Sequence, residues 1–411
     1  MKRVIVSAVE ASGDRLGGAL LRELARLARF EAMGIGGPEL ATAGMLPVPG
    51  SAPAHAVMGT TELAGGAVRI VRNAWALRSA LADADVLVTI DGPDFHLPLA
   101  RAARARGIPV VGYVSPQVWA WRRGRIPAIA RAYDRLLCLF AFEPALYAGT
   151  GLDARWVGHP AVDASTPSRR DDGVLALLPG SRASELAAHL ADFVATAALL
   201  RDGVEGWRAR EVLLPRAPML SSDLLQGLPS WVRVTTREEV LARADRALTK
   251  SGTSTLELAL AGIPAVVAHR TGWLTWQLAR RLVRQVGPVL PDAPAPDPAP
   301  RQLPRIALPN LLLGEDVYAE HLQDFRPADL ATDLARAAAP PTARLAALLR
   351  PPEASRSAPS PSEPGRSGAH GPAPSSLPAS TAAEHAAAAM VDLVTGGNRQ
   401  PPKIAAQSDK T

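Results

Sequence analysis

The sequence has 411 residues, of which 47% are hydrophobic and 20% are charged, so it holds enough apolar side chains for sizeable cores and is not a wholly disordered chain. A single cysteine, Cys138, excludes an intrachain disulfide framework and a cysteine-rich metal site, which fits a reduced, cytoplasmic setting. The formal net charge of +6 favours anionic partners, but scattered arginines and only 4% aromatic residues argue against nucleic-acid binding. Since no window holds 18 uncharged apolar residues, we expect no transmembrane helix.

The first half of the chain alternates short β-rich runs with helical patterns. We expect strands at residues 4–8, 86–90, 110–113 and 136–139. Leu16, Leu20, Leu24 and Leu27 recur at helical spacing, and a second helix is expected over residues 98–106, closed by Gly107. Strands that alternate with helices in this way predict βαβ units and a mainly parallel sheet.

The same rhythm restarts after residue 170, with strands expected at 174–178, 211–214, 246–249 and 264–268 and helices from Ser184 and about Ser254. The sequence therefore predicts an α/β protein with two Rossmann-like domains and an interdomain cleft. We expect the first domain at 1–165 and the second at 166–350, including a proline-rich loop at 291–304. A low-complexity insert at 351–379, a final helix at 380–395 and a flexible tail at 396–411 complete the expected organisation.

Ligands of open parallel sheets bind beyond the carboxyl ends of the strands, so the loops after each strand are the candidate sites. Glu10, Ser12 and Asp14 surround Gly13 directly after the first strand, which is typical of a polar loop that binds a ligand. Alternatively, Ser12 or Asp14 is only the N-cap of the following helix. Asp91 ends the second strand, where a carboxylate is well placed to act as a general base, and Asp94 follows shortly after. The alternative is that both aspartates only form the turn around Gly92 and Pro93.

Two loops of the second half have features of phosphate sites. Residues 178–182 precede a helix and combine a glycine with Arg182. After the strand at 246–249, Ser251, Gly252 and Thr253 offer hydroxyls and backbone donors to a diphosphate, and Glu257 offers a carboxylate to ribose hydroxyls. The alternative for the second loop is a plain capping box formed by Ser254 and Glu257. The two loops together predict a nucleotide-linked substrate in the interdomain cleft.

The segment 113–123 is both aromatic and basic. Trp119 and Trp121 precede Arg122 and Arg123, a pattern that fits either core plus rim or an amphipathic lip that contacts lipid. His159, between Gly158 and Pro160, has no partner at metal-ligand spacing and is interpreted as a structural histidine between the domains.

Taken in order, several strings resemble the lipid-A-disaccharide synthase family, inverting glycosyltransferases of the two-Rossmann GT-B type. The strings cover most of residues 4–325: 10–14 (EASGD), 34–38 (GIGGP), 57–59 (VMG) with Glu62, 90–95 (IDGPDF), 113–116 (YVSP), 118–122 (VWAWR), Phe142 with Glu143, 158–160 (GHP), 178–182 (LPGSR), 251–253 (SGT), 255–257 (TLE), 308–310 (LPN), and Glu320 with Gln323.

The resemblance implies that the 6-hydroxyl of 2,3-diacylglucosamine 1-phosphate (lipid X) attacks the anomeric carbon of UDP-2,3-diacylglucosamine, releasing UDP. Asp91 matches the family's candidate base, and Glu10 and Ser12 match its first polar loop. Asn310, Glu320 and Gln323 match donor-side positions. No metal and no cofactor are implied, so Arg182 and the Ser251 loop would stabilise the departing diphosphate.

The family binds the inner face of the inner membrane peripherally, so an anionic membrane surface is an expected partner. Family members often exchange C-terminal segments, so a homodimer is among the expected assemblies. The two proline-rich segments, which are not typical of the family, lie in that half of the chain.

The sequence is compatible with two rival interpretations. The first is another UDP-sugar enzyme of the same architecture, such as a UDP-N-acetylglucosamine 2-epimerase or a different glycolipid glycosyltransferase. An epimerase would not need an amphipathic lip at Trp119 and Trp121. The second is a non-catalytic protein that binds membranes or nucleic acid through its basic charge, and for it the two phosphate-type loops would be coincidental.

Overall fold

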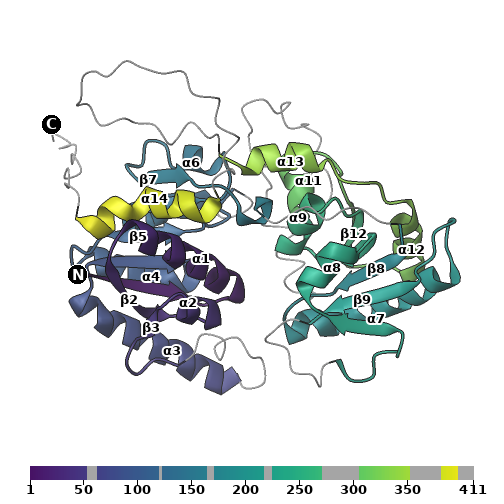
Figure 1. Ribbon diagram of the computed structural model, residues 1–411, viewed down its shortest axis with the longest axis horizontal. Coiled ribbons are helices and arrows are strands. Elements are labelled where there is room, and N and C mark those ends of the chain that lie inside the picture. Colours follow the sequence, from purple (N-terminus) through teal and green to yellow (C-terminus); the bar gives the residue numbers. More distant parts are fainter. Residues whose placement is uncertain are drawn as a thin grey trace, which may run out of the picture.

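Two parallel β-sheets, each packed against helices, form two lobes that lie side by side in the computed structural model (Figure 1). The structure describes residues 1–52, 63–119, 123–163, 171–216, 225–270, 305–351 and 381–396, with only the backbone for 63–67. The first sheet has the strand order β3-β2-β1-β4-β5-β6-β7 and the second β10-β9-β8-β11-β12-β13, and all pairings are parallel. The prediction of two Rossmann-like domains is confirmed.

The strands of the first sheet are β1 (Lys2–Ala8), β2 (Phe30–Ile35), β3 (Leu46–Pro47), β4 (Val86–Ile90), β5 (Val110–Tyr113), β6 (Arg135–Cys138) and β7 (Asp153–Trp156). Those of the second are β8 (Val174–Leu178), β9 (Glu211–Pro215), β10 (Val232–Thr235), β11 (Arg246–Thr249), β12 (Ala265–His269) and β13 (Ala319–Leu322). The helices are α1 (Ala11–Leu27), α2 (Pro38–Thr42), α3 (Leu63–Ala80), α4 (Pro93–Arg104), α5 (Ile126–Ala132), α6 (Glu143–Leu146), α7 (Ala183–Asp202), α8 (Arg237–Arg243), α9 (Thr253–Leu260), α11 (Leu308–Leu313), α12 (Pro327–Arg336), α13 (Thr342–Leu349) and α14 (Ala382–Thr395).

Central strands are buried on both faces, which explains their continuous apolar sequence. Successive residues of β1 enter different cores: Val4 and Val6 join one cluster and Ile5 joins the other. In β8, Leu175 and Leu177 pack on one face and Ala176 on the opposite one. Every residue of β4 and β8 is buried, so no titratable side chain lies within these strands and charged groups are confined to their ends.

The predicted strands at 86–90, 110–113, 174–178 and 246–249 have the observed bounds, and the other predicted strands differ by one or two residues. The helix predicted to begin at Pro98 begins five positions earlier, at Pro93, because proline is tolerated in the first helical turn. The segments 291–304, 352–379 and 397–411 lie outside the described residues.

Helix α14 crosses back from the second half of the chain and packs against α1 of the first lobe (Figure 1). Arg135 on β6 fixes it there: the guanidinium donates to the Ala389 carbonyl and to Asp392 Oδ1, both at 2.6 Å, and to Asp153 at 2.7 Å. The Arg135 side chain is 9% exposed, so these contacts satisfy a buried charge.

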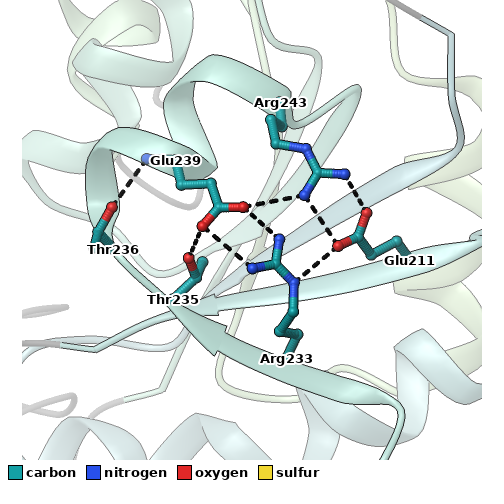
Figure 2. Close-up of polar contacts among 6 residues, drawn as sticks. All are labelled: Glu211, Arg233, Thr235, Thr236, Glu239 and Arg243. Atoms are coloured by element: carbon teal, nitrogen blue, oxygen red, sulfur yellow. Dashed lines mark hydrogen bonds and ion pairs between the residues drawn. The ribbon is translucent and has the colours of Figure 1, made fainter.

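A second charged network joins β9, β10 and α8 at the surface of the other lobe (Figure 2). Arg233 donates to Glu211 at 2.9 Å and to Glu239 at 2.5 Å, and Arg243 pairs with both glutamates. The hydrogen bonds of Arg233 and of Thr235 lower the pKa of Glu239 to about 2. Each of the two arginines pairs with both glutamates. The role of the network is therefore to hold the edge strand β10 rather than to bind a ligand.

Among the described helices, α7 alone is long and apolar enough to span a membrane by length and composition. It packs against α12 and β8 as part of the second lobe.

The contacts of Arg135 lead to a stability prediction. We expect Arg135→Met to lower the free energy of unfolding of the first lobe by about 1–3 kcal/mol, because Asp153 and Asp392 lose a buried partner but are themselves partly exposed. Urea denaturation measures this difference. Arg155→Met is the comparison variant, since Arg155 also pairs with Asp153 but is 44% exposed and reaches the Ala389 carbonyl only at 3.4 Å. Equal effects of the two substitutions would show that Arg135 does not fix α14.

Candidate functional site

The carboxyl ends of the two sheets bring together charged residues from both lobes. Glu10 and Asp91 follow β1 and β4, while Arg182 and Lys250 follow β8 and β11. Arg182 Nη2 donates to Glu10 Oε1 across the two lobes at 3.4 Å. We call Glu10, Asp91, Arg182, Glu185 and Lys250 the interdomain cluster.

Asp91 occupies an unusual backbone position. Its φ is 55° and that of Gly92 is 54°, so two consecutive residues adopt the left-handed conformation between β4 and α4. Its N–H donates to the Tyr113 carbonyl at 2.9 Å, and its Oδ1 accepts from the Gly92 N–H at 2.8 Å. Such backbone strain persists only where its surroundings fix it and is concentrated at functional sites. The turn thus leaves the Asp91 carboxylate half-buried at the edge of the sheet.

His96, in the first turn of α4, stabilises this strained turn through a hydrogen bond to its backbone. Its Nδ1 lies 2.6 Å from the Asp91 carbonyl oxygen and its Nε2 lies 2.9 Å from Ser7 Oγ. Burial lowers the pKa of His96 to about 4, so the ring is neutral. A carbonyl can only accept, so Nδ1 carries the proton and Nε2 accepts from the serine hydroxyl. His96 therefore fixes the position of Asp91 and does not itself exchange a proton near neutral pH.

Glu10 is electrostatically coupled to both lobes. Burial and the neighbouring Asp91 charge raise its pKa, while Arg182 and Lys250 act in the opposite direction. Two carboxylates of the first lobe, Glu10 and Asp91, therefore lie near two cations of the second, Arg182 and Lys250.

In the second lobe, Glu185 organises the cations. Its Oε1 accepts from Lys250 Nζ at 2.8 Å, and its Oε2 accepts from the backbone N–H of Ser181 at 2.8 Å and of Arg182 at 3.3 Å. Burial raises the pKa of Glu185, but the hydrogen bond and charge of Lys250 outweigh this and lower it. The two amides of the predicted phosphate loop are thus used by Glu185. The Arg182 guanidinium, 47% exposed, is the accessible positive group of this loop.

The second predicted phosphate loop leads into α9. Ser251 Oγ donates to the Ile306 carbonyl at 2.8 Å, Gly252 is the N-cap residue, and Thr253 is exposed in the first turn. The prediction of a capping box formed by Ser254 and Glu257 is wrong, because the N-cap residue is Gly252, two positions before Ser254, and Glu257 pairs with Arg237 of α8.

The three donor-side residues implied by the resemblance lie around β13. Asn310 is buried and bonds Tyr318 in both directions, at 2.8 and 2.9 Å. Glu320 accepts from the backbone N–H groups of Ile306 and Ala307, which precede α11, and from Asn310. Gln323 has a φ of 65°, and its N–H donates to the carbonyl of His269, the last residue of β12. Asn310 and Glu320 thus shape the loop that contacts Ser251.

The N-cap interpretation of Ser12 and Asp14 is wrong. Glu10 is the N-cap residue of α1, and Ser12 lies half-buried in the first turn. The Asp14 carboxylate instead accepts from the amides of Gly37, Glu39 and Leu40, at 2.7 to 3.1 Å, and so caps α2.

The lip expected around Trp119 is also wrong in part. Trp119 is only 2% exposed, since its ring packs edge-on against Phe142 at 5.3 Å. Arg125 is paired with Asp94 at 2.8 Å, and Trp121 and Arg122 lie outside the described residues.

His159 is buried, and its N–H donates to the Leu349 carbonyl at 3.0 Å, which joins the two chain passages between the lobes.

Sequence reasoning passed over His96, Glu185 and Lys250, and also a histidine pair of the second lobe. His189 and His269 lie with ring centroids 5.7 Å apart. Lys250 directly follows β11, and His269 is the last residue of β12. Ligands bind beyond the carboxyl ends of parallel strands, so the argument that selected Asp91 applies to both residues. His96 was missed because the helix was expected to begin after it. Among the described residues, no three His, Cys, Asp or Glu side chains are grouped as metal ligands.

Comparison with known proteins agrees with this architecture. The family model for lipid-A-disaccharide synthetase matches residues 4–332. The lipid-A-disaccharide synthase of Alkalilimnicola ehrlichii is 38% identical over 348 residues, which cover 78% of this chain and 85% of that protein. The enzyme of the same name from Geobacter sulfurreducens is 35% identical over 356 residues, or 81% and 87% of the two chains.

A solved structure, that of the calicheamicin glycosyltransferase CalG4, has the same fold. Its TM-score is 0.52 at 15% identity, covering 84% of this chain and 92% of that one, and it identifies the fold as GT-B. The solved structure shows only the fold, whereas the family model and the relatives above show the family. The chain belongs to the lipid-A-disaccharide synthase family.

Proposed function

We propose that this chain transfers a diacylglucosamine unit from UDP-2,3-diacylglucosamine to the 6-hydroxyl of 2,3-diacylglucosamine 1-phosphate, giving lipid A disaccharide 1-phosphate and UDP. The observation that carries the proposal is the interdomain cluster. In it the half-buried carboxylates of the first lobe face the cations of the second, and Glu10 contacts Arg182 across the lobes at 3.4 Å. A reaction between a hydroxyl and a nucleoside diphosphate sugar needs both kinds of group.

In this proposal Asp91 is the general base. As the acceptor's 6-hydroxyl attacks the anomeric carbon, its proton passes to the Asp91 carboxylate, a new C–O bond forms, and the bond to the diphosphate oxygen breaks with its electron pair leaving on UDP. Attack opposite the leaving group inverts the anomeric centre. Glu10, coupled to Asp91, keeps negative charge near the attacking hydroxyl, and Ser12 lies two residues further along, in the first turn of α1.

The departing diphosphate is stabilised in this proposal by the second lobe. Arg182 and Lys250 supply positive charge, and α7 and α9 both begin at the carboxyl edge of the second sheet, where the positive ends of their helix dipoles lie. Ser251, Gly252 and Thr253 bind the diphosphate, and Glu257 the ribose. Asn310, Glu320 and Gln323 act from the donor side, the first two by shaping the loop beside Ser251.

The substrates carry acyl chains, so the enzyme must meet a lipid surface, and α3 is the best-suited contact. Val68, Val71 and Trp75 lie on one helix face and are 54% to 67% exposed, whereas Asn73 and Leu77 on the other face are buried. The helix contains Arg69, Arg72 and Arg78 and no acidic residue. An apolar stripe flanked by cations suits an anionic membrane interface. We propose that this helix holds the enzyme peripherally at the inner face of the inner membrane.

The proposed activity is tested by incubating the purified chain with UDP-diacylglucosamine and the lipid monosaccharide acceptor. Mass spectrometry should detect the acylated disaccharide 1-phosphate and UDP in equal amounts. Release of free sugar without disaccharide would argue against the assigned acceptor.

Asp91→Asn should reduce kcat about 10²-fold or more and leave the affinity for UDP unchanged, because the amide cannot take the proton but fits the same turn. Steady-state kinetics and UDP calorimetry separate the two effects. Asp94→Asn is the matched control, as Asp94 is exposed in the next turn and pairs with Arg125. Turnover of Asp91→Asn at the wild-type rate would exclude Asp91 as the base.

Arg182→Ala should weaken UDP binding about tenfold or more, since a charge-assisted hydrogen bond contributes roughly 1.5–3 kcal/mol. Isothermal titration calorimetry measures the change. Arg208→Ala serves as the control because Arg208 is an exposed arginine of the same lobe that precedes β9. If both variants bind UDP as tightly as the wild type, Arg182 does not contact the diphosphate.

Replacing Val71 and Trp75 with serine should reduce sedimentation with vesicles that contain anionic phosphatidylglycerol and leave UDP affinity unchanged. Burial of an indole and a branched side chain in the interface drives binding, and salt should weaken the arginine contribution. Val234→Ser, at an exposed valine of β10, is the control. Undiminished sedimentation of the double variant would mean that α3 is not the membrane contact.

A further inference from the structure

Glu143 is a buried acid that the proposed reaction does not use. It begins α6, just after β6, and is 1% exposed. Its carboxyl group accepts from the backbone N–H groups of Leu139 and Phe140, both at 3.0 Å. Both amides donate to the same oxygen, Oε2.

The surroundings of Glu143 favour its neutral form. Burial raises its pKa to about 8, although the two amides, the Trp119 indole and the Ser115 hydroxyl act against this. The titratable groups that face it are Cys138 on β6 and Tyr147 after α6, and burial holds the pKa of both above their ordinary values. None of these neighbours supplies a positive charge to pair with an ionised Glu143.

Glu143 lies where two loops of the first lobe meet. The loop after β5 contributes Ser115 and Trp119, and the loop after β6 contributes Phe140 and Phe142, on which the Trp119 ring packs edge-on at 6.2 and 5.3 Å. Ser115 Oγ is 3.0 Å from the Tyr147 hydroxyl, which extends the contact toward α6.

The loop after β5 also lies against the proposed base. The N–H of Asp91 donates to the carbonyl of Tyr113, and Val114, the next residue, has a φ of 78°. A valine in the left-handed region is strained and holds that conformation only if the following residues are fixed. The buried packing of Ser115 and Trp119 supplies that constraint.

We propose that Glu143 is a positioning residue: by binding the amides of Leu139 and Phe140 it fixes the loop after β6, on whose aromatic rings Trp119 of the loop after β5 packs, and thereby shapes the acceptor side of the site next to Asp91. This inference rests on the proposed function. It assigns a role to Glu143 that concerns acceptor binding and not the UDP donor, because Glu143 belongs to the lobe that carries Asp91.

The test compares Glu143→Gln with Glu143→Leu. Glutamine keeps a carbonyl oxygen for the two amides and an N–H donor in place of the acid O–H, so kcat and both KM values should stay within about twofold of wild type. Leucine removes these bonds and should raise the KM for the lipid acceptor about fivefold or more, with the Kd for UDP unchanged. A glutamine variant as impaired as the leucine variant would overturn the proposal, since an ionised carboxylate would then be required.

A pH profile gives a second readout. A folded pKa raised above the ordinary value of 4.5 stabilises the folded protein at low pH, and this contribution is lost as pH rises through about 8. Between pH 7 and 9 the acceptor KM of the wild type should rise and its melting temperature should fall. Both should change less in Glu143→Gln, while Asp94→Asn should follow the wild type. Identical profiles of wild type and Glu143→Gln would contradict the proposal.

The melting experiment needs no substrate, so the two proposals fail separately. If the wild type forms no disaccharide, the proposed function is wrong, whereas the pH dependence of melting still tests the protonated Glu143. If Glu143→Leu does not fold, the glutamine variant alone decides.

Discussion

Parallel strands that are buried on both faces have no room for a charged side chain except at their ends. This constraint governs where chemistry occurs in the molecule. Within β4 and β8 every residue is buried, so the first charged groups after each strand, Asp91 and Arg182, lie at the carboxyl edge. Because the two sheets meet at these edges, the same constraint brings acid and base groups of the two lobes together, as the contact of Glu10 with Arg182 shows.

The constraint also explains how much the sequence predicts. Continuous apolar runs such as Val86–Ile90 and Val174–Leu178 are set by local composition, so their bounds were predicted correctly, and the polar residues that follow them were found by the same reasoning. Asp91, Glu10 and Arg182 come together in the structure, while their roles in binding and catalysis stay predictions. The motif resemblance named the family, which the comparisons confirm.

What the sequence does not predict are contacts between residues distant along the chain. Trp119 has an amphipathic neighbourhood in sequence, but Phe140 and Phe142 from the next loop bury it. Asp14 looks like the cap of its own helix, yet the amides it satisfies lie more than 20 residues away, at the start of α2. Helix α3 was not among the predicted elements, and an exposed apolar stripe on a helix is recognised only once the neighbours of the helix are known.

The return of α14 to the first lobe has a consequence for folding during synthesis. The apolar face of α1, with Leu20 and Leu24, belongs to the same core cluster as Ala386 and Met390 of α14. On a ribosome α1 emerges among the first residues, but its covering helix is made only after the whole second sheet. The early lobe therefore exposes part of its core for most of the elongation time, when a nascent chain is most prone to aggregate and to be bound by chaperones.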